Sequence, residues 1–197
     1  MRTQYYTACS LDGFIAGPGH DLAWLVQFNE AEGTSYAEFI REVGAVAMGS
    51  HTYEWILRQH VGPEAGASLP WPYQQPCWVL TTRSLPGVPG ADIRFARGDV
   101  RPVHDAMRAA AGGRNVWLVG GGDLVGQFHD AGLLDDVIVQ FAPVTLGAGS
   151  PLLPRSITSP PLRLVEARTC GGVFAELRYE VPRGDRPTPT PEKASSP

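Results

Sequence analysis

The sequence contains almost no lysine: fifteen of its 16 basic residues are arginine, and the only lysine is Lys193, close to the C-terminal end. A Schiff-base nucleophile, a pyridoxal-phosphate anchor and a Walker-type phosphate loop each need a lysine ammonium at a defined position. These three kinds of site are therefore excluded from the body of the chain. Any anion bound there is held by arginine, hydroxyl groups or backbone amides.

Long apolar runs and clusters of basic residues are missing as well. Apolar stretches such as 115–119 are far shorter than the roughly 20 residues that cross a bilayer, and the first residues lack the pattern of a signal peptide. The formal net charge is −4 and the basic residues are scattered, which disfavours nucleic acid as a partner. We expect a cytoplasmic protein that binds neither membrane nor nucleic acid.

Cysteine is scarce, with only Cys9, Cys77 and Cys170 in the chain. An odd number at wide spacing fits neither a disulfide framework nor a zinc site. We expect three buried, reduced strand residues and no bound metal.

Proline is plentiful and gathers in two places. Residues 182–197 contain five prolines and almost no apolar residues, which predicts a disordered tail. The stretch Gly62–Pro76 is an unusually long loop, which is typical of a functional or mobile segment. In residues 1–181 we expect one domain, because strand-like segments alternate there with helical ones, the pattern of a sheet covered by helices.

The periodicity of apolar residues predicts the individual elements. It predicts strands over 2–10, 14–16, 45–48, 77–81, 93–96, 115–119, 136–143, 162–169 and 173–181, and helices over 36–43, 53–59, 103–111 and 124–131. We expect Thr34 or Ser35 to cap the first helix and Gly44 to end it. The Gly171–Gly172 turn predicts an antiparallel hairpin.

Three consecutive glycines, Gly120, Gly121 and Gly122, join an apolar strand to an apolar helix. Residues without Cβ let a ligand approach the backbone, and the free amides of the helix start point at it. This pattern predicts a pyrophosphate cradle, with tight strand-to-helix packing as the structural alternative. The Rossmann fingerprint fits poorly, because the glycine spacing is one residue too long.

Two further strand ends carry anion-binding groups: Ser50, His51 and Thr52 after one strand, and Thr81, Thr82 and Arg83 after another. Ser50 and Thr52 could cap the following helix or bind an anion. Taken alone, His51 also fits a packing residue and Arg83 a solvated surface charge. Ligands of open α/β sheets collect at the carboxyl ends of strands, so the three ends together predict a dinucleotide site.

Four segments, TACSLDGFIA, MGSHTYE, VLTTR and LVGGGDLVGQF, occur in the order and spacing of the dihydrofolate reductase family. SLDGFIA and FAPVTLGAGSPLL resemble its bacterial branch, related to the C-terminal reductase domain of the riboflavin-biosynthesis bifunctional deaminase-reductase. The resemblance covers residues 2 to about 181. It implies a three-layer α/β sandwich: a mostly parallel central sheet of about eight strands with an antiparallel C-terminal edge, and flanking helices.

The same resemblance implies NADPH as hydride donor and assigns residues to it. Gly49, Ser50, His51 and Thr52 would bind the 2′-phosphate and pyrophosphate region, and Thr81, Thr82 and Arg83 the adenosine side with its 2′-phosphate. The pyrophosphate would also lie on Gly120, Gly121, Gly122, Asp123 and Leu124, and the nicotinamide along Ala8, Ile15 and Ala16.

On the substrate side, the resemblance implies that the loop Gly17–Leu25, with Trp24, covers the site as a lid. It also implies substrate contacts from Phe14, Tyr36 and Ile40. The sequence differs from dihydrofolate reductases proper at one position. Those enzymes carry a pterin-binding carboxylate at the start of the helix before the MG motif, and the matching residues 33–36 include no acid. Glu32 and Glu38 lie nearby in the sequence, but we expect Glu38 to face solvent. Dihydrofolate is therefore not the expected substrate.

Asp12 is the remaining acid near the expected nicotinamide position. It is a candidate catalytic residue that orients or protonates a polar substrate. The alternative is a turn residue that bonds the backbone ahead of Gly13.

Together these observations predict an NADPH-dependent oxidoreductase that transfers a hydride to a small heterocyclic, pteridine- or pyrimidine-like substrate. The resemblance relates it to 5-amino-6-(5-phosphoribosylamino)uracil reductase, but the sequence shows no deaminase zinc signature, which favours a stand-alone reductase. A nucleotide-binding or regulatory module without turnover is the alternative. A hydrolase using Ser50 or His51 is disfavoured, since no Gly-x-Ser-x-Gly elbow is present. The resemblance also implies a homodimer through the C-terminal strands.

Overall fold

The computed structural model describes residues 1–28, 34–61 and 70–182 of the chain. The predicted disordered tail lies outside these residues except for Pro182, and so do Glu32 and residues 62–69 of the predicted long loop. The remainder of that loop, 70–76, has no regular secondary structure. Its Trp71 packs against Tyr53 of a neighbouring helix, with ring centroids 5.6 Å apart.

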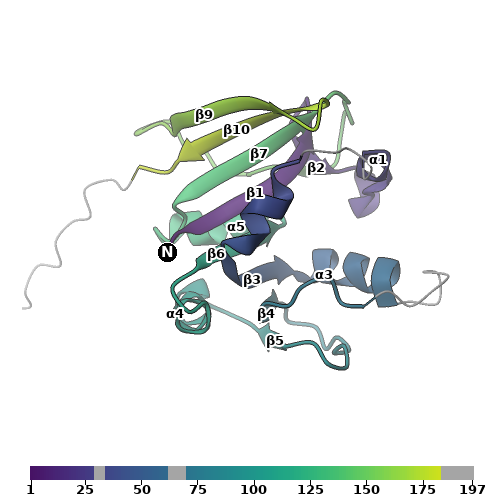
Figure 1. Ribbon diagram of the computed structural model, residues 1–197, viewed down its shortest axis with the longest axis vertical. Helices are drawn as coiled ribbons and strands as arrows, with labels where there is room; N and C mark the ends of the chain where they lie inside the picture. The colour runs from purple at the N-terminus through teal and green to yellow at the C-terminus, as the bar shows by residue number, and fades with distance from the viewer. Residues whose placement is uncertain (29–33, 62–69, 183–197) are drawn as a thin grey trace, which may run out of the picture.

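An eight-stranded sheet forms the centre of the molecule (Figure 1), in the order β5-β4-β3-β6-β1-β7-β10-β9. From one edge to the other, these strands are Ile93–Ala96, Cys77–Leu80, Val43–Gly49, Asn115–Gly120, Thr3–Ser10, Asp136–Ala142, Phe174–Glu180 and Arg163–Cys170. Neighbours from β5 to β7 are parallel, while β10 pairs antiparallel with β7 and β9. The predicted mostly parallel sheet with its antiparallel C-terminal hairpin is confirmed.

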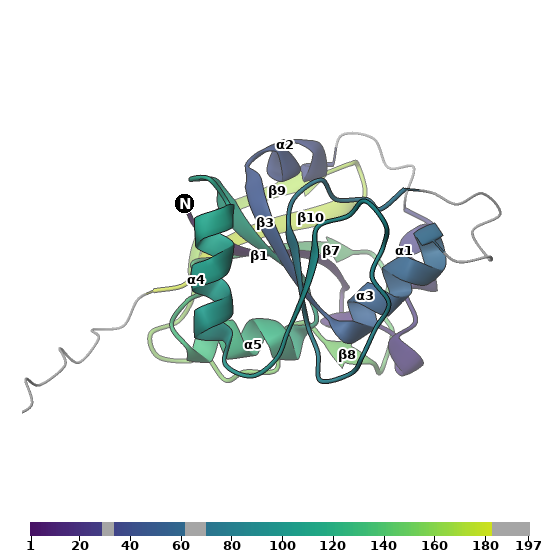
Figure 2. The same ribbon diagram turned by 90° about the horizontal axis from the view of Figure 1, so that it is seen from below.

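Helices cover both faces of the sheet, because successive strand side chains alternate between two apolar cores. Tyr5 packs with α4 (Val100–Ala110) and α5 (Gly122–Asp130), whereas Tyr6 packs with α2 (Tyr36–Arg41) and α3 (Ser50–Ile56). Figure 2 shows α4 and α5 next to each other. The remaining helical segments are η1 (Pro18–His20), α1 (Ala23–Val26) and η2 (Leu57–Val61). The layers are those of the predicted sandwich.

Gly44 lies inside β3, so the prediction that it ends a helix is wrong. The helix α2 ends at Arg41 with Glu42 as its C-cap. A Cβ on Gly44 would sit 2.2 Å from the carbonyl oxygen of Ala111, at the end of α4. The glycine is therefore required by close packing of the helix on the strand.

A second, two-stranded sheet was not predicted. It pairs β2 (Phe14–Ala16) antiparallel with β8 (Ser150–Pro151). Two residues are too short a run to give a periodic signal, so the sequence offered no means of finding β8. This small sheet fixes the start of the segment that runs over the carboxyl ends of the central strands.

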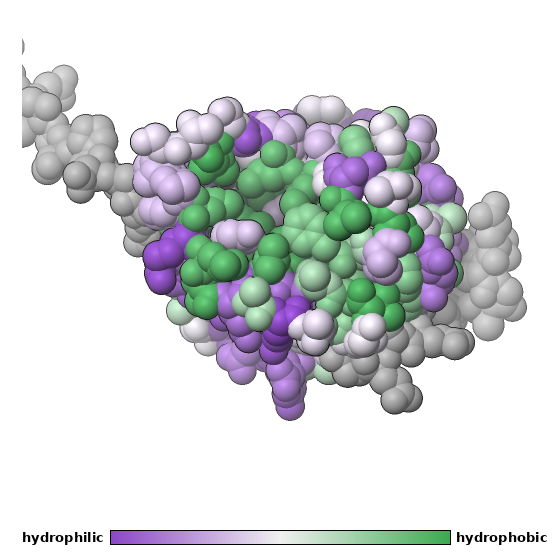
Figure 3. Space-filling view, turned by 90° about the horizontal axis from the view of Figure 1, so that it is seen from above, coloured by the Kyte–Doolittle hydropathy of each residue, from purple (hydrophilic) through white to green (hydrophobic). Residues whose placement is uncertain are grey.

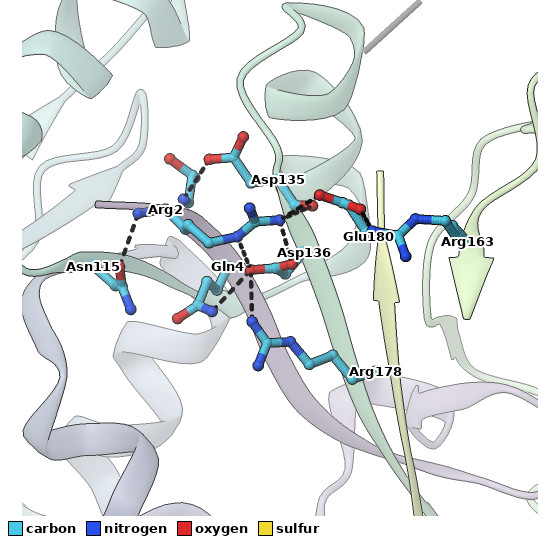
Figure 4. A network of polar contacts seen from close by, with 9 residues as sticks. Arg2, Gln4, Asn115, Asp135, Asp136, Arg163, Arg178 and Glu180 are labelled. Carbon is cyan, nitrogen blue, oxygen red and sulfur yellow. Dashed lines mark hydrogen bonds and ion pairs between the residues drawn. The ribbon is translucent and has the colours of Figure 1, made fainter. Parts of the chain in front are cut away.

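An ion network around the buried Asp136 joins the amino-terminal ends of β1 and β7 to the carboxyl-terminal end of β10 (Figure 4). Asp136, whose side chain is 1% exposed, accepts from Arg2 Nε at 2.6 Å, from Gln4 Nε2 at 2.9 Å and from Arg178 Nη2 at 3.4 Å. Burial alone would raise the pKa of Asp136, but the hydrogen bonds from Arg2 and Gln4 and the two arginine charges hold it below its ordinary value.

All three cysteines are buried and none is in a disulfide, as predicted. Burial raises the pKa of Cys9 and of Cys77 to about 12, which keeps both thiols protonated. Within the described residues no group of His, Cys, Asp and Glu side chains is arranged to hold a metal ion. The described helices are too short or too polar to span a membrane.

Candidate functional site

A cavity of about 840 Å³ opens at the carboxyl ends of five strands, β5, β4, β3, β6 and β1. Its lining comprises Thr7, Ala8, Ile15, Ala16, His20, Leu22, Leu25, Gly49–Thr52, Trp55, Ile56, Tyr73, Leu80–Arg83, Arg97, Gly98, Val119–Leu124, Gln127, Gly149–Pro151 and Pro154. The carboxyl ends of parallel strands meet at one edge of a sheet, which is why these distant segments share a cavity.

The fifteen residues predicted to bind the cofactor all line this one cavity. Five other predicted residues, Asp12, Phe14, Trp24, Tyr36 and Ile40, are not among its lining residues. Trp24 packs instead against the small core that contains Phe174, and Ile40 against the core under α2. The roles predicted for these residues stay predictions.

Backbone amides at the start of α5 face this end of the sheet. Gly121 is the N-cap, so the first N–H groups of α5 have no partner within the helix. A Cβ on Gly121 would meet no atom within 4 Å, which leaves open space beside the backbone. Gly122 differs, because its Cβ would lie 2.5 Å from the carbonyl oxygens of Pro151 and Leu152. The glycine run thus combines an open cradle with one position that packing demands.

The helix α3 begins at Ser50 with Gly49 as its N-cap, and no side chain caps it. The prediction that Ser50 or Thr52 caps this helix is therefore wrong, because Gly49 holds the N-cap position and neither hydroxyl group bonds the helix start. Both residues line the cavity instead, where their hydroxyl groups are available to a ligand.

Arg83 already has a partner. Its Nη1 and Nη2 donate to the two carboxylate oxygens of Glu54 at 3.0 and 2.7 Å, a bidentate pair. Arg97, which follows β5 and also lines the cavity, was not singled out from the sequence. Its position after a strand is the same signal that led to Arg83.

His20 and His51 stack across the mouth of the cavity, with ring centroids 4.0 Å apart and planes at 22°. The pKa of His51 is lowered by burial and by the charges of His20 and Arg83, while Glu54 opposes them. His20 Nδ1 lies 3.1 Å from Ser150 Oγ. The contact between the two histidines joins the loop after β2 to α3.

Asp12 lies in the turn between β1 and β2. It accepts hydrogen bonds from Ser10 Oγ at 2.6 Å and from the backbone N–H groups of Leu146 and Gly147, the latter at 2.7 Å. These bonds lower its pKa, with the Ser10 bond the largest cause. These contacts tie the β1–β2 turn to the loop at Leu146 and Gly147, so the main partners of Asp12 differ from the backbone ahead of Gly13 that the structural alternative predicted.

A buried carboxylate does lie beside the start of α2, but it comes from β10. Glu176 is 4% exposed and accepts hydrogen bonds from Ser35 Oγ, from Gln140 Nε2 at 2.8 Å and from Arg168 Nε at 2.8 Å. Burial would raise the pKa of Glu176, but these three bonds and the Arg168 charge lower it overall. Glu38 is exposed, as predicted. Glu176 does not line the cavity, so its carboxylate belongs to the support of α2.

The sheet order and the cavity at its carboxyl edge define the class of protein, an α/β domain of dihydrofolate reductase-like fold. The sequence model of the RibD C-terminal domain family matches residues 71–175, just over half of the chain. The chain therefore belongs to the RibD C-terminal domain family, which confirms the resemblance found in the sequence.

Two curated relatives come from Bacillus subtilis (strain 168), and both are described as uncharacterized. The chain is 29% identical to YwjB over 178 residues, covering 90% of this chain and 97% of that protein. It is 22% identical to YyaP over 175 residues, covering 87% and 90%. Each relative thus matches this chain over nearly its whole length.

Solved structures of similar fold include a putative riboflavin biosynthesis protein from Shewanella sp. PV-4, with TM-score 0.73, 22% identity, and coverage of 91% of this chain and 98% of that one. RibD of Acinetobacter baumannii gives a TM-score of 0.63 at 15% identity, and the match covers 91% of this chain and 57% of that one. A third structure, with a TM-score of 0.61 and 17% identity, is a diaminohydroxyphosphoribosylaminopyrimidine deaminase/5-amino-6-(5-phosphoribosylamino)uracil reductase from Thermotoga maritima. The match covers 91% of this chain and 56% of that one. At these identities the likeness establishes the fold.

Proposed function

We propose that this protein is an NADPH-dependent reductase that transfers a hydride to a small heterocyclic substrate. The observation that carries the proposal is the order of chemical groups along the sheet edge. Arg97 and Arg83 lie at the β5 and β4 end, amides and hydroxyl groups at β3 and β6, and the small residue Ala8 at β1. Five neighbouring strands are separated by four spacings of about 4.8 Å, so this edge spans about 19 Å, a length suited to an extended dinucleotide.

The groups along this edge fit the parts of NADPH one by one. Free N–H groups of α5 and the open space beside Gly121 suit the pyrophosphate. The arginine side chains suit the 2′-phosphate, since a planar guanidinium binds phosphate well. The apolar side chains of Ile15, Leu22 and Leu25 suit the flat nicotinamide ring. No lysine is needed at any of these points.

Bound NADPH would supply the hydride, and the residues of the chain orient it and exclude water. Ala8 of β1 leaves room for the ring beside the strand, while Leu22 and Leu25 approach from the segment after β2. Among the lining residues not assigned to the cofactor, Thr7, Tyr73 and Ser150 carry hydroxyl groups; Ser150 already contacts His20, which leaves Thr7 and Tyr73 for the substrate. Burial raises the pKa of Tyr73, so its hydroxyl stays protonated and available as a hydrogen-bond donor.

The substrate class follows from the family. The Thermotoga relative is a 5-amino-6-(5-phosphoribosylamino)uracil reductase by its name, so a pyrimidine-like compound heads the panel of substrates to be tested. Pterins form the second group of that panel.

Binding of NADPH is tested by calorimetry and by energy transfer from the five tryptophans to the bound nicotinamide. The variant Gly121→Ala places a methyl group in the open space beside the backbone, and we expect it to weaken NADPH about tenfold or more. Gly87→Ala is the matched control, since a Cβ there also meets no atom within 4 Å and Gly87 is outside the cavity lining. Saturable binding that both variants retain unchanged would contradict the assignment of the cradle.

A nucleotide-binding module without turnover is the second candidate. The observation that favours it is that Asp123 is the sole carboxylate among the described lining residues, and Asp123 pairs with Arg155 at 3.2 Å. Oxidation of NADPH with any member of the substrate panel decides for the reductase. Tight NADPH binding without turnover on the whole panel decides for the module.

We also propose that the protein forms a homodimer through β9 and β10. Leu164 and Val165 of the edge strand β9 are 53% and 49% exposed. Figure 3, which looks onto the β9–β10 side, shows a broad apolar area there. An exposed edge strand with apolar side chains is a ready surface for a second copy of the chain. As in the sequence analysis, a cytoplasmic location and the lack of membrane and nucleic-acid partners stay predictions.

A further inference from the structure

His20 lies in the segment after β2, and contacts from two other elements hold its side chain. It is the last residue of η1 and adopts φ 63°, in the left-handed region that few residues other than glycine visit. Two contacts hold its ring, Ser150 Oγ at 3.1 Å and the stacked ring of His51 at 4.0 Å between centroids. A residue that keeps an uncommon backbone conformation at a site is a reason to look for a function.

The charged and titratable groups around the two rings come from four elements. Glu54 lies on α3 with His51, and Arg83 follows β4; both act electrostatically on His51. Arg97 follows β5 and lines the same cavity, and Asp21 follows His20 in the chain. Glu54 is neutralised by its bidentate pair with Arg83. The formal charges of these four side chains sum to zero, so the two histidine rings are the groups here that can add positive charge.

We propose that His20 and His51 form a histidine clamp that closes over a phosphate group of the bound dinucleotide and takes up a proton from the buffer when it does so. The proposal rests on the proposed function and deepens it, because it adds His20 to the cofactor site and couples binding to protonation. His20 is a positioning residue, since its contact also holds the loop with Leu22 over the cavity.

The physical reason is charge. Two stacked imidazolium rings repel each other, so the empty clamp favours at least one neutral ring. A phosphate group within about 4 to 6 Å reverses this preference, because a nearby opposite charge stabilises the protonated form. A stacked pair of one neutral and one charged imidazole then binds the anion and keeps the loop closed. Binding to the folded, clamped form therefore draws in a proton by linkage.

The first measurement is calorimetry of NADPH binding at pH 7 in buffers of different ionisation enthalpy, which gives the number of protons exchanged. We expect uptake of about half to one proton by the wild-type protein. His20→Asn tolerates the left-handed backbone and removes the titrating ring. The variant should abolish most of the proton uptake and weaken NADPH binding about fivefold to tenfold at pH 7. The difference in affinity between variant and wild type should disappear near pH 9.

His129→Asn is the matched control, because His129 lies on α5 away from the cavity lining and pairs with Asp130. It should bind NADPH with the same affinity and the same proton uptake as the wild type. Wild-type binding without proton uptake, or a His20→Asn variant that matches the wild type in both quantities, overturns the clamp.

A second measurement separates the clamp from the proposed function. Inorganic pyrophosphate is titrated into the protein while the histidine rings are followed by NMR, with assignments from the His20→Asn and His51→Asn variants. We expect the titration midpoints of His20 and His51 to rise and that of His129 to stay constant. If these midpoints rise although NADPH does not bind, the clamp stands and the dinucleotide proposal fails. If NADPH binds and neither midpoint responds, the clamp is overturned and the reductase proposal stands.

Discussion

At the scale of single residues, Arg83 faces a competition between two acceptors. In the structure it forms a bidentate pair with Glu54, whose side chain is 27% exposed. In the proposed complex it contacts the 2′-phosphate of NADPH. Glu54 therefore disfavours phosphate binding in two ways: it occupies the guanidinium of Arg83, and it adds negative charge nearby.

The variant Glu54→Gln should free Arg83 and bind NADPH about three to ten times more tightly than the wild type. NADH lacks the 2′-phosphate, so its affinity should change by less than about twofold. Arg83→Gln should have the opposite selectivity and weaken NADPH far more than NADH. Paired titrations of both cofactors check this, and equal responses of NADPH and NADH would remove Arg83 from the phosphate site.

Asp136 gives a prediction for stability that is independent of the cavity. Its pKa is lowered in the folded protein, so its contribution is complete above the unfolded pKa of about 3.9 and is lost as pH falls through the folded value. Asp136→Asn should cost about 3 kcal/mol in the free energy of unfolding at pH 7, since it removes the buried negative charge to which Arg2, Gln4 and Arg178 donate.

Urea unfolding of both proteins between pH 2 and 7 checks the prediction, with a gap that is constant from about pH 5 upward and narrows below about pH 4. Asp92→Asn is the control, because Asp92 is 47% exposed in its pair with Arg94 and should cost less than about 1 kcal/mol. An equal loss in the free energy of unfolding of the two variants would show that the burial of Asp136 does not increase its contribution to stability.

The anion-binding residues found from the sequence share one property, which is a position at or just after the carboxyl end of a strand. Thr81 and Gly120 were found because ligands collect where parallel strands end. His20 and Glu176 were missed, because their roles depend on contacts with His51 and Ser35, which are distant in the sequence. Arg97 also follows a strand, but its segment has no hydroxyl residues and so lacks the combined signal of Thr81, Thr82 and Arg83.

At the scale of elements, α4 and β3 meet at a point where a side chain has no room. Gly44→Ala would place its Cβ 2.2 Å from the Ala111 carbonyl oxygen, so we expect a loss of about 3 kcal/mol in the free energy of unfolding. Gly87→Ala should change stability by less than about 0.5 kcal/mol. Thermal or urea unfolding of the two variants checks this, and equal stabilities would show that α4 moves away without cost.

Periodicity predicted the longer elements to within a few residues, since alternating strands and amphipathic helices leave a repeating signal. It placed α4 at 103–111 rather than Val100–Ala110, because the cap formed by Asp99 with the N–H of Arg101 starts the helix earlier. The two residues of β8 and the four of α1 carry no such signal, and only the folded chain shows them.

At the scale of the whole molecule, the dimer proposal is tested on the edge strand. Val165→Lys puts a charge on the exposed apolar side of β9 and should shift a dimer toward monomer, with the dissociation constant rising about tenfold or more. Sedimentation over a range of concentrations measures this. Leu11→Lys is the control, because Leu11 is 66% exposed in the β1–β2 turn, away from β9. A wild-type species of only 21.2 kDa at all concentrations would refute the dimer.

Contacts from several parts of the site converge on the segment from Gly149 to Leu152. Ser150 contacts His20, Pro151 and Leu152 limit Gly122, the hydroxyl of Tyr5 donates to the carbonyl of Leu152, and the Leu152 N–H donates to Gly13. For protein engineering, this means that a change in these four residues would move several segments of the cavity at once. Libraries that alter cofactor or substrate preference should leave its length unchanged and vary the residues that face it.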